Sequence, residues 1–253
     1  MRVAEIFRSI QGEGRLTGVE SIFVRSSGCN LRCRFCDTPY ASWTPEGDDL
    51  SVNEILDRVE ELRRQPPPEF LAPQGPHGRQ EDSAPVAGAR HAVLTGGEPM
   101  LFAELIPLTA RLHEQGWHIT VETSGTLYLP VTCDLMSISP KLSNSTPPAE
   151  LEPRWTRRHA LNRQHPEVMR RLLAEYDYQL KFVIDCPADC AEVETYLAGL
   201  PEIERGRVLL MPQGVDTQGL AEKAQWLEPY CRRHGLAFCP RRQVEWFAAR
   251  RGR

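Results

Sequence analysis

The sequence predicts an α/β fold in which strands and helices alternate, and two observations lead to this prediction. Short apolar runs such as HAVLTGG and YQLKFVID are each followed by a segment with apolar residues at helical spacing. Polar motifs then follow the ends of five runs: SSGC, TGGEP, ETSG, SPK and PQG. Such alternation favours a parallel sheet with right-handed crossovers, whose functional groups gather at the carboxyl ends of the strands. The five motifs should therefore face one common cleft.

The elements can be placed along the chain from periodicity and punctuation. We expect strands at 3–7, 21–28, 91–97, 118–125, 133–141, 178–185, 207–214 and 236–238, and helices at 51–65, 101–116, about 161–176, about 188–200 and 216–234. Ser51 and Glu54 have the spacing of a capping box at the start of the first helix. Gly116 is expected to end the second helix, and Pro107 to kink it. We find no internal repeat and expect one domain over residues 1–253.

Two segments depart from this pattern. Prolines and glycines crowd the stretch from Gln65 to Arg90, which we expect to be a long loop. A tolerated surface insertion is favoured there over a lid or a partner-binding loop. The arginine-rich end, from Arg241 to Arg253, is expected to be a solvated tail and not an RNA-binding arm.

Composition limits the partners and the compartment. The formal net charge of −4 gives no general attraction to nucleic acid or to an anionic membrane, so we expect neither as a partner. No stretch has the length and apolarity of a membrane span, and the N-terminus lacks the apolar core of a signal peptide. We therefore expect a cytoplasmic protein, in whose reducing surroundings the eight cysteines do not form a disulfide framework.

Three cysteines, Cys29, Cys33 and Cys36, lie within eight positions and have no fourth partner nearby. Structural zinc sites need four ligands, commonly as two separated pairs. Three thiolates instead suit a four-iron, four-sulfur (4Fe-4S) cluster with one iron left open for a ligand. A closed zinc or electron-transfer module is the alternative, but it leaves TGGEP and SPK unexplained. The remaining cysteines are read as ordinary thiols: Cys133, Cys186, Cys190, Cys231 and Cys239.

The C-x-x-x-C-x-x-C spacing, with Phe35 before the last cysteine, resembles the signature of the radical S-adenosylmethionine (SAM) superfamily. The resemblance implies a partial (β/α) barrel whose open iron binds SAM and whose reduction yields a deoxyadenosyl radical. Thr95–Pro99, TGGEP, is similar to the superfamily motif that contacts the SAM amino group. Glycines allow a close backbone approach, and Glu98 could accept hydrogen bonds from an ammonium group.

Three further stretches, EIFRSIQGEGRLTG, CDTPYASW and SISPK, narrow the resemblance to the 7-carboxy-7-deazaguanine synthase family. This implies a lyase that converts 6-carboxy-5,6,7,8-tetrahydropterin to 7-carboxy-7-deazaguanine by hydrogen abstraction, ring contraction and loss of ammonia. SAM is regenerated and Mg²⁺ assists. A flavodoxin or ferredoxin-type electron donor and a homodimer are also implied.

The resemblance also assigns residues to roles. Cys29, Cys33 and Cys36 would hold the cluster, and Thr38 would be the one protein ligand to Mg²⁺. The substrate would be bound by Ile10, Gln11, Gly12, Arg25 and Thr95. SAM would be contacted by Phe35, Cys36, Asp37, Gly97, Glu98, Ser139, Pro140, Lys141, Met211, Pro212, Gln213 and Gly214. A guanidinium suits a substrate carboxylate, although a surface strand charge is an equal interpretation of Arg25 from the residues alone. Glu122, Thr123 and Ser124 could face the same cleft or only satisfy turn hydrogen bonds.

One position departs from the family pattern. Gln243 stands where the family often has a histidine near the substrate, and an amide cannot titrate near neutral pH. Any acid–base role there is in doubt, and a changed substrate is a third hypothesis. The nearest catalytic rival is a glycyl-radical activase, which would not need Arg25 and the Gln-Gly-Glu-Gly stretch for a small acidic substrate.

Overall fold

The computed structural model describes residues 1–66, 90–150, 152–201, 203–248 and 252. Within them nine strands form a single sheet, in the order β3-β1-β2-β4-β5-β6-β7-β8-β9. The strands are β1 (Arg2–Ile10), β2 (Glu20–Ser26), β3 (Asp48–Asp49), β4 (His91–Gly96), β5 (His118–Thr123), β6 (Leu135–Ile138), β7 (Tyr178–Ile184), β8 (Val208–Pro212) and β9 (Ala237–Phe238). Since β3 and β9 lie at opposite ends of this order, the sheet is an open, partial barrel.

The sheet is parallel from β2 to β9, as the alternation predicts, but β1 runs antiparallel to both β2 and β3. The antiparallel arrangement of β1 and β2 follows from the short connection between them, residues 11–19. The Gln11 N–H donates to the Val19 carbonyl and the Gly18 N–H to the Gln11 carbonyl, at 2.8 Å each. So short a connection can join only antiparallel neighbours.

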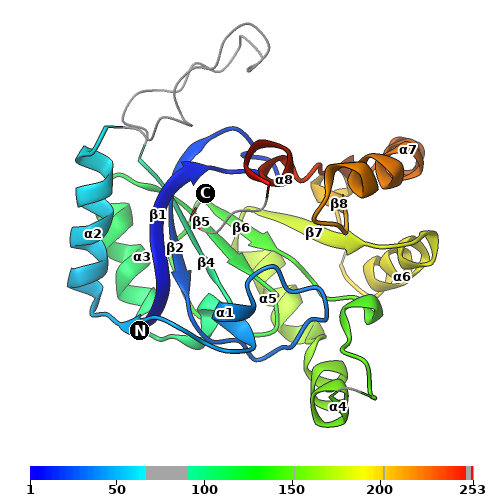
Figure 1. Ribbon diagram of the computed structural model, residues 1–253, viewed down its shortest axis with the longest axis horizontal. Coiled ribbons are helices and arrows are strands. Elements are labelled where there is room, and N and C mark those ends of the chain that lie inside the picture. Colours follow the sequence, from blue (N-terminus) through cyan, green and yellow to red (C-terminus); the bar gives the residue numbers. More distant parts are fainter. Residues whose placement is uncertain (67–89, 151, 202, 249–251, 253) are drawn as a thin grey trace, which may run out of the picture.

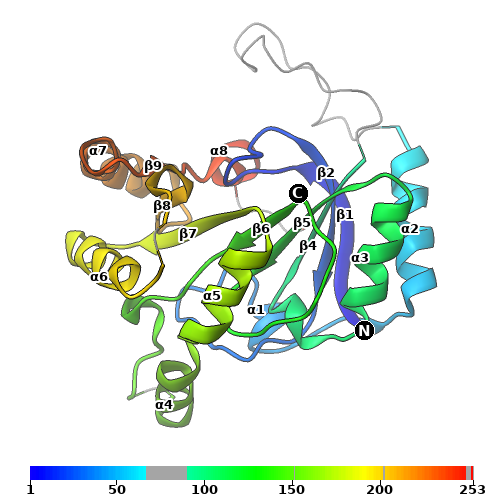
Figure 2. The same ribbon diagram turned by 180° about the vertical axis from the view of Figure 1, so that it is seen from behind.

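Most of the longer helices cover the outer, convex face of the sheet (Figures 1 and 2), whereas the short first and last helices, at 39–42 and 242–247, contribute residues to the concave side. The helices are α1 (Pro39–Ser42), α2 (Val52–Arg64), α3 (Leu105–Glu114), α4 (Pro153–Asn162), α5 (Pro166–Glu175), α6 (Pro187–Ala198), α7 (Thr217–His234) and α8 (Arg242–Phe247), with short 3₁₀ turns η2 (Pro99–Leu101), η3 (Ser143–Ser145) and η4 (Arg205–Arg207). The capping box of Ser51 and Glu54 is confirmed at the start of α2. No helix in the described ranges is both long and apolar enough to cross a membrane.

Three expectations about the helices are wrong. The helix expected at about 161–176 begins only at Pro166, which cannot continue a helix from the residues before it and instead begins α5, and residues 161–162 end a separate helix, α4, that was not expected. Pro107 does not kink α3, because it lies in the first turn, where its missing N–H has no intrahelical acceptor. The start of the helix expected at 101–116 is instead the turn η2, and α3 begins only at Leu105.

The arginine-rich end is not wholly a solvated tail. It begins with a buried Arg241 and continues as α8, whose Val244 and Phe247 are also buried. Residues 249–251 and 253 lie outside the described residues. So do residues 67–89, which make up nearly all of the loop expected at 65–90.

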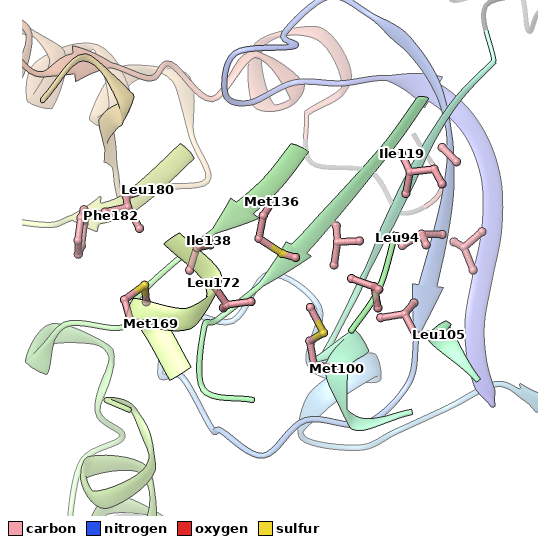
Figure 3. Close-up of a cluster of buried hydrophobic side chains, with 14 of the residues drawn as sticks. Leu94, Met100, Leu105, Ile119, Met136, Ile138, Met169, Leu172, Leu180 and Phe182 are labelled. Atoms are coloured by element: carbon pink, nitrogen blue, oxygen red, sulfur yellow. The ribbon is translucent and has the colours of Figure 1, made fainter. Parts of the chain in front are cut away.

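Strand alternation separates the core from a polar concave face. Leu180 and Phe182 of β7 are fully buried, and Met136 and Ile138 of β6 are buried beside them. Figure 3 shows these side chains packed with Met169 and Leu172 of α5. The residues between them point to the opposite face, since successive side chains in a strand alternate. The polar residues of that second face line the site described next.

Candidate active site

A cavity of roughly 730 Å³ opens on the concave face of the sheet. Strands β1, β2, β4, β5, β6, β7 and β8 contribute residues to it, and the loop after β2 supplies the three cysteines. It brings together most of the residues that the sequence singled out: Ile10, Gln11, Gly12, Arg25, Cys29, Cys33, Phe35, Cys36, Asp37, Thr38, Thr95, Gly97, Ser139, Lys141, Met211 and Gln213. Among the described residues, Glu98, Pro140, Pro212 and Gly214 were expected at the site but do not line it.

The cysteine loop is held by local hydrogen bonds. The Leu31 N–H donates to Cys29 Sγ at 3.4 Å, and the Ser42 hydroxyl lies 3.1 Å from Cys36 Sγ. The Trp43 indole N–H donates to the Cys33 carbonyl at 3.1 Å. These bonds fix the path of the chain through the loop, so the thiols face the cavity before any ligand arrives.

The TGGEP motif holds the cysteine loop through its backbone. The Gly97 N–H donates to the Ser26 carbonyl at 3.1 Å, and the Glu98 N–H donates to the Gly28 carbonyl at 2.8 Å. A Cβ atom on Gly97 would overlap the carbonyl oxygens of Gly28 and Ala41. The glycine therefore permits close approach of the chain to itself, one residue before Cys29.

Glu98 is fully buried, and its carboxylate oxygens already accept hydrogen bonds from other groups of the protein. Its oxygens accept hydrogen bonds from the Thr123 hydroxyl at 2.8 Å, and from the Ser124 N–H at 2.8 Å and hydroxyl at 2.5 Å. The Met100 N–H donates to it as well, at 3.1 Å. Glu98 thus ties the end of β5 to the end of β4. Its contact with the SAM ammonium stays a prediction.

Arg25 lies inside the cavity and not on an outer surface. Its Nε donates to Glu5 Oε1 at 2.7 Å, and the Tyr40 hydroxyl donates to the same oxygen at 2.8 Å. The guanidinium carbon also lies 5.8 Å from the centre of the Phe7 ring. These contacts hold the planar group in one orientation at the cavity wall, and its binding of a substrate carboxylate stays a prediction.

A buried ion pair in the cavity was missed by the sequence reasoning. Lys181 of β7 is only 6% exposed and donates a hydrogen bond to Glu13. Burial by itself raises the pKa of Glu13, but attraction to Lys181 and Arg241 outweighs it and lowers that pKa to about 2. Burial by itself lowers the pKa of Lys181, and attraction to Glu13 outweighs it and raises that pKa. The sequence did contain a signal for a buried charge: Lys181 stands between the apolar Leu180 and Phe182, in a strand whose composition predicts burial on both faces.

Arg241 joins three loops around the cavity mouth. It is 6% exposed and donates to Asp37, to the Gly214 carbonyl at 2.5 Å and to Glu13 Oε1 at 3.4 Å. These partners come from the cysteine loop, the loop after β8 and the loop after β1. The contact also explains how Gly214 belongs to the site without lining it.

The chain is similar to proteins of known function along nearly its whole length. Residues 23–72 match the model of the radical SAM superfamily. A 7-carboxy-7-deazaguanine synthase from Rhodopirellula baltica is 40% identical over 251 residues, covering 99% of this chain and 88% of that protein. Another from Halobacterium salinarum is 38% identical, covering 96% of this chain and 88% of that protein. The chain belongs to the 7-carboxy-7-deazaguanine synthase family.

Solved structures agree with this family's fold. The crystal structure of QueE from Escherichia coli matches with a TM-score of 0.63 at 22% identity, covering 94% of this chain and 92% of that one. Streptococcus suis SuiB bound to S-adenosylmethionine matches with a TM-score of 0.52 at 12% identity, covering 85% of this chain and 48% of that one. At these identities the likeness concerns the fold alone, and it confirms the partial barrel of a radical SAM enzyme.

A radical SAM enzyme uses a 4Fe-4S cluster and SAM, and the donor set here fits the cluster. Burial raises the pKa of Cys29 to about 12, helped by the nearby Glu98 carboxylate, and raises that of Cys33 to about 11. Iron would reverse this, because a coordinating thiol loses its proton. No group of three His, Cys, Asp or Glu side chains in the described part of the chain is placed to hold one metal ion. In a cluster, by contrast, each thiolate binds its own iron around a shared space.

Gln243, which departs from the family pattern, lines the cavity. Its amide nitrogen donates to Glu13, and its Cβ lies where a side chain on Gly12 would collide. Its amide oxygen is buried without a hydrogen-bond partner in the described residues. The amide therefore replaces a titratable ring in contact with the Glu13–Lys181 pair.

Proposed function

We propose that this chain converts 6-carboxy-5,6,7,8-tetrahydropterin to 7-carboxy-7-deazaguanine with loss of ammonia. One observation carries the proposal: a single cavity joins the three cysteines to Arg25 and to the loop at Ile10–Gly12. Radical chemistry and recognition of a small acidic substrate would thus share one enclosed space. Family membership at 40% identity supports the same reaction.

In this proposal Cys29, Cys33 and Cys36 hold the cluster. SAM lies against residues contributed by four segments of the cavity: Phe35, Asp37, Gly97, Ser139, Lys141, Met211 and Gln213, with Glu98, Pro140, Pro212 and Gly214 supporting their loops. When bound, the cluster would supply one electron that cleaves SAM, and this cleavage provides the radical that removes a hydrogen atom from the substrate. The protein's part is to hold the reacting carbon near SAM, which a cavity backed by the rigid sheet supports.

The substrate carboxylate is placed at Arg25. Because the Arg25 Nε is already engaged by Glu5, its two terminal nitrogens are the ones available for a two-pronged contact. Thr95 and the Ile10–Gly12 loop, with Gln11, hold the ring system. Gln11 is itself oriented by a hydrogen bond from its amide nitrogen to Glu122 at 3.1 Å.

Mg²⁺ is assigned to Thr38. Its hydroxyl lies 3.9 Å from Cys36 Sγ at the cavity wall and makes no capping hydrogen bond to α1. A hydroxyl that serves no cap can serve an ion. Mg²⁺ commonly keeps several waters and is bridged by substrate oxygens, so one protein ligand with the substrate carboxylate is sufficient.

We further propose that residues 1–253 act as one domain, which the continuous sheet supports. The family resemblance supports a homodimer and reduction by a flavodoxin or ferredoxin-type donor. A cytoplasmic location is supported by the reduced state that three cluster-binding thiols require.

One anaerobic assay tests the function. The reconstituted enzyme is given dithionite, SAM, Mg²⁺ and carboxytetrahydropterin, and carboxydeazaguanine is sought by mass spectrometry. Many turnovers per SAM are expected. Deoxyadenosine formed at the same rate with and without the pterin would instead indicate an activase or a changed substrate. The Cys33→Ala variant serves as the control for background chemistry.

A further inference from the structure

We propose that the outer face of α4 docks an acidic one-electron carrier protein that reduces the cluster. This α4 basic face consists of Arg154, Arg157 and Arg158, together with Trp155 and Arg32. The inference rests on the proposed function, since it presumes that the cysteines hold a reducible cluster. Two observations support it: the attachment of α4 to the cysteine loop, and the positive charge of its outer side.

Helix α4 is attached directly to the cysteine loop. His159, on the buried side of the helix, accepts a hydrogen bond at its Nδ1 from the Arg32 N–H at 3.1 Å. Its Nε2 lies 2.9 Å from the Ser145 hydroxyl, and the Ser145 carbonyl accepts from the Arg34 N–H at 2.9 Å. Arg32 and Arg34 flank Cys33. A protein bound to the outer side of α4 would therefore sit one helix away from the cluster loop.

Helix α4 carries three exposed arginines, and the exposed carboxylates nearest to them along the chain, Glu150 and Glu152, lie at its N-terminal end. Arg154, Arg157 and Arg158 are exposed, and the helix contains no acidic residue. None of these three arginines forms an ion pair with another part of the chain that the structure describes, whereas surface arginines elsewhere do, as in Arg171 with Glu175 and Arg205 with Glu194. In a chain of net charge −4, this is a local concentration of arginines that no carboxylate of the described residues pairs with directly. Such a field steers an acidic partner toward one face.

An aromatic contact connects this face to the cluster loop. The guanidinium carbon of Arg32 lies 4.2 Å from the centre of the Trp155 ring, and that of Arg158 lies 5.1 Å from it. The Arg32 guanidinium also donates to the Cys29 carbonyl at 2.8 Å. Electron transfer slows steeply with distance, so a short path from the surface through Arg32 to a cluster ligand favours this face over others.

The helix is also accessible. Figures 1 and 2 show α4 standing apart from the other helices at one end of the molecule, clear of the concave face through which a small substrate enters. Redox partners form small, weak and electrostatically guided interfaces. A protruding basic helix suits such an encounter, and it leaves the cavity free during reduction.

The test measures cluster reduction, not product. Anaerobic holoenzyme is mixed with a reduced flavodoxin, and the rate is followed by the cluster's optical and electron-spin signals at low and high salt. The variant R154E/R157E/R158E should slow reduction about tenfold or more at low salt and lose most of the salt dependence. Reduction by dithionite should change less than about twofold, since dithionite needs no docking surface.

The matched control is R58E/R170E/R233E, which makes the same change in net charge at exposed arginines of other helices. An equal effect in both variants would overturn the proposal. If the first variant loses its cluster, the neutral pair R157Q/R158Q replaces it, and an unchanged rate and salt dependence there would also overturn it. If the first variant is reduced by flavodoxin like the wild type but loses an RNA gel shift that the wild type gives, the face binds RNA and the proposal is overturned. Normal reduction without deazapurine would reject the proposed function and keep the docking site.

Discussion

Arg241 donates a hydrogen bond to Asp37, two residues that are 204 positions apart in the chain. Asp37 lies between the last cluster cysteine and Thr38, so the contact fastens the C-terminal segment onto the loop that carries the chemistry. The same guanidinium reaches Glu13 and the Gly214 carbonyl. One buried cation thus joins three loops at the mouth of the open barrel.

Replacing this cation should therefore damage both stability and cofactor binding. Arg241→Ala leaves Glu13 with one buried partner fewer, and we expect a loss of about 3 kcal/mol in the free energy of unfolding. We also expect a raised KM for SAM with a smaller change in kcat. Arg241→Lys should recover part of the stability but not the KM, since a lysine cannot reach three partners at once. Equal KM values for all three proteins would remove the positioning role.

Gly97 should not tolerate a methyl group. In Gly97→Ala the new Cβ would overlap two backbone carbonyls, at Gly28 and Ala41, and the cysteine loop would have to move. We expect the variant to incorporate well under half of the wild-type iron on reconstitution. Gly206→Ala is the control, because a Cβ at Gly206 meets nothing within 4 Å. Iron and sulfide analysis decides the matter, and equal content in the two variants would contradict the assignment.

Thr38 should govern Mg²⁺ dependence without supporting the fold. Its hydroxyl makes no cap to α1, so Thr38→Ala should melt within about 1 °C of the wild type, as uncapped surface positions do. The concentration of Mg²⁺ needed for half-maximal activity should rise several-fold, and Thr38→Ser should restore it. A Thr38→Ala enzyme with an unchanged Mg²⁺ titration would show that the ion is held elsewhere.

His91 should make stability depend on pH. The ring is buried between the Ser21 and Thr120 hydroxyls, and burial, with His118 nearby, lowers its pKa from 6.5 to about 4. Between these values the unfolded chain binds a proton that the folded protein does not, so stability falls as pH falls through this window. The contribution is about 3 kcal/mol at most, from about 1.4 kcal/mol per pKa unit.

The comparison that isolates this effect is His91→Gln against the wild type, melted anaerobically at pH 7.5 and pH 5.5. We expect the variant to be less stable at both values but to lose less on acidification. His159, whose pKa is also lowered to about 4 by burial, is present in both proteins, so some pH dependence should remain. Parallel losses in the two proteins would show that His91 does not titrate in this window.

Much of the site could be predicted because its motifs consist of residues close together in the sequence. The spacing of Cys29, Cys33 and Cys36 predicts a cluster with an open iron without knowledge of any distant contact. The rule that parallel strands present their carboxyl ends to one edge placed Thr95, Glu122 and Ser139 on a single cavity. Gln243 was noted only as a departure from the family pattern, and its place in that cavity was left open until the structure showed it.

The sequence alone thus determined which motif follows each strand, and it predicted the cluster ligands, because both depend on residues close together in the chain. Only the tertiary structure revealed that Glu13, Lys181 and Arg241 form one buried charge network. It also showed that the Glu98 carboxylate accepts hydrogen bonds from the end of β5, and that α4 packs on the cysteine loop. These facts depend on groups far apart in sequence. Their charges and hydrogen bonds acquire partners only when folding removes them from water, and no local pattern records which partner each will meet.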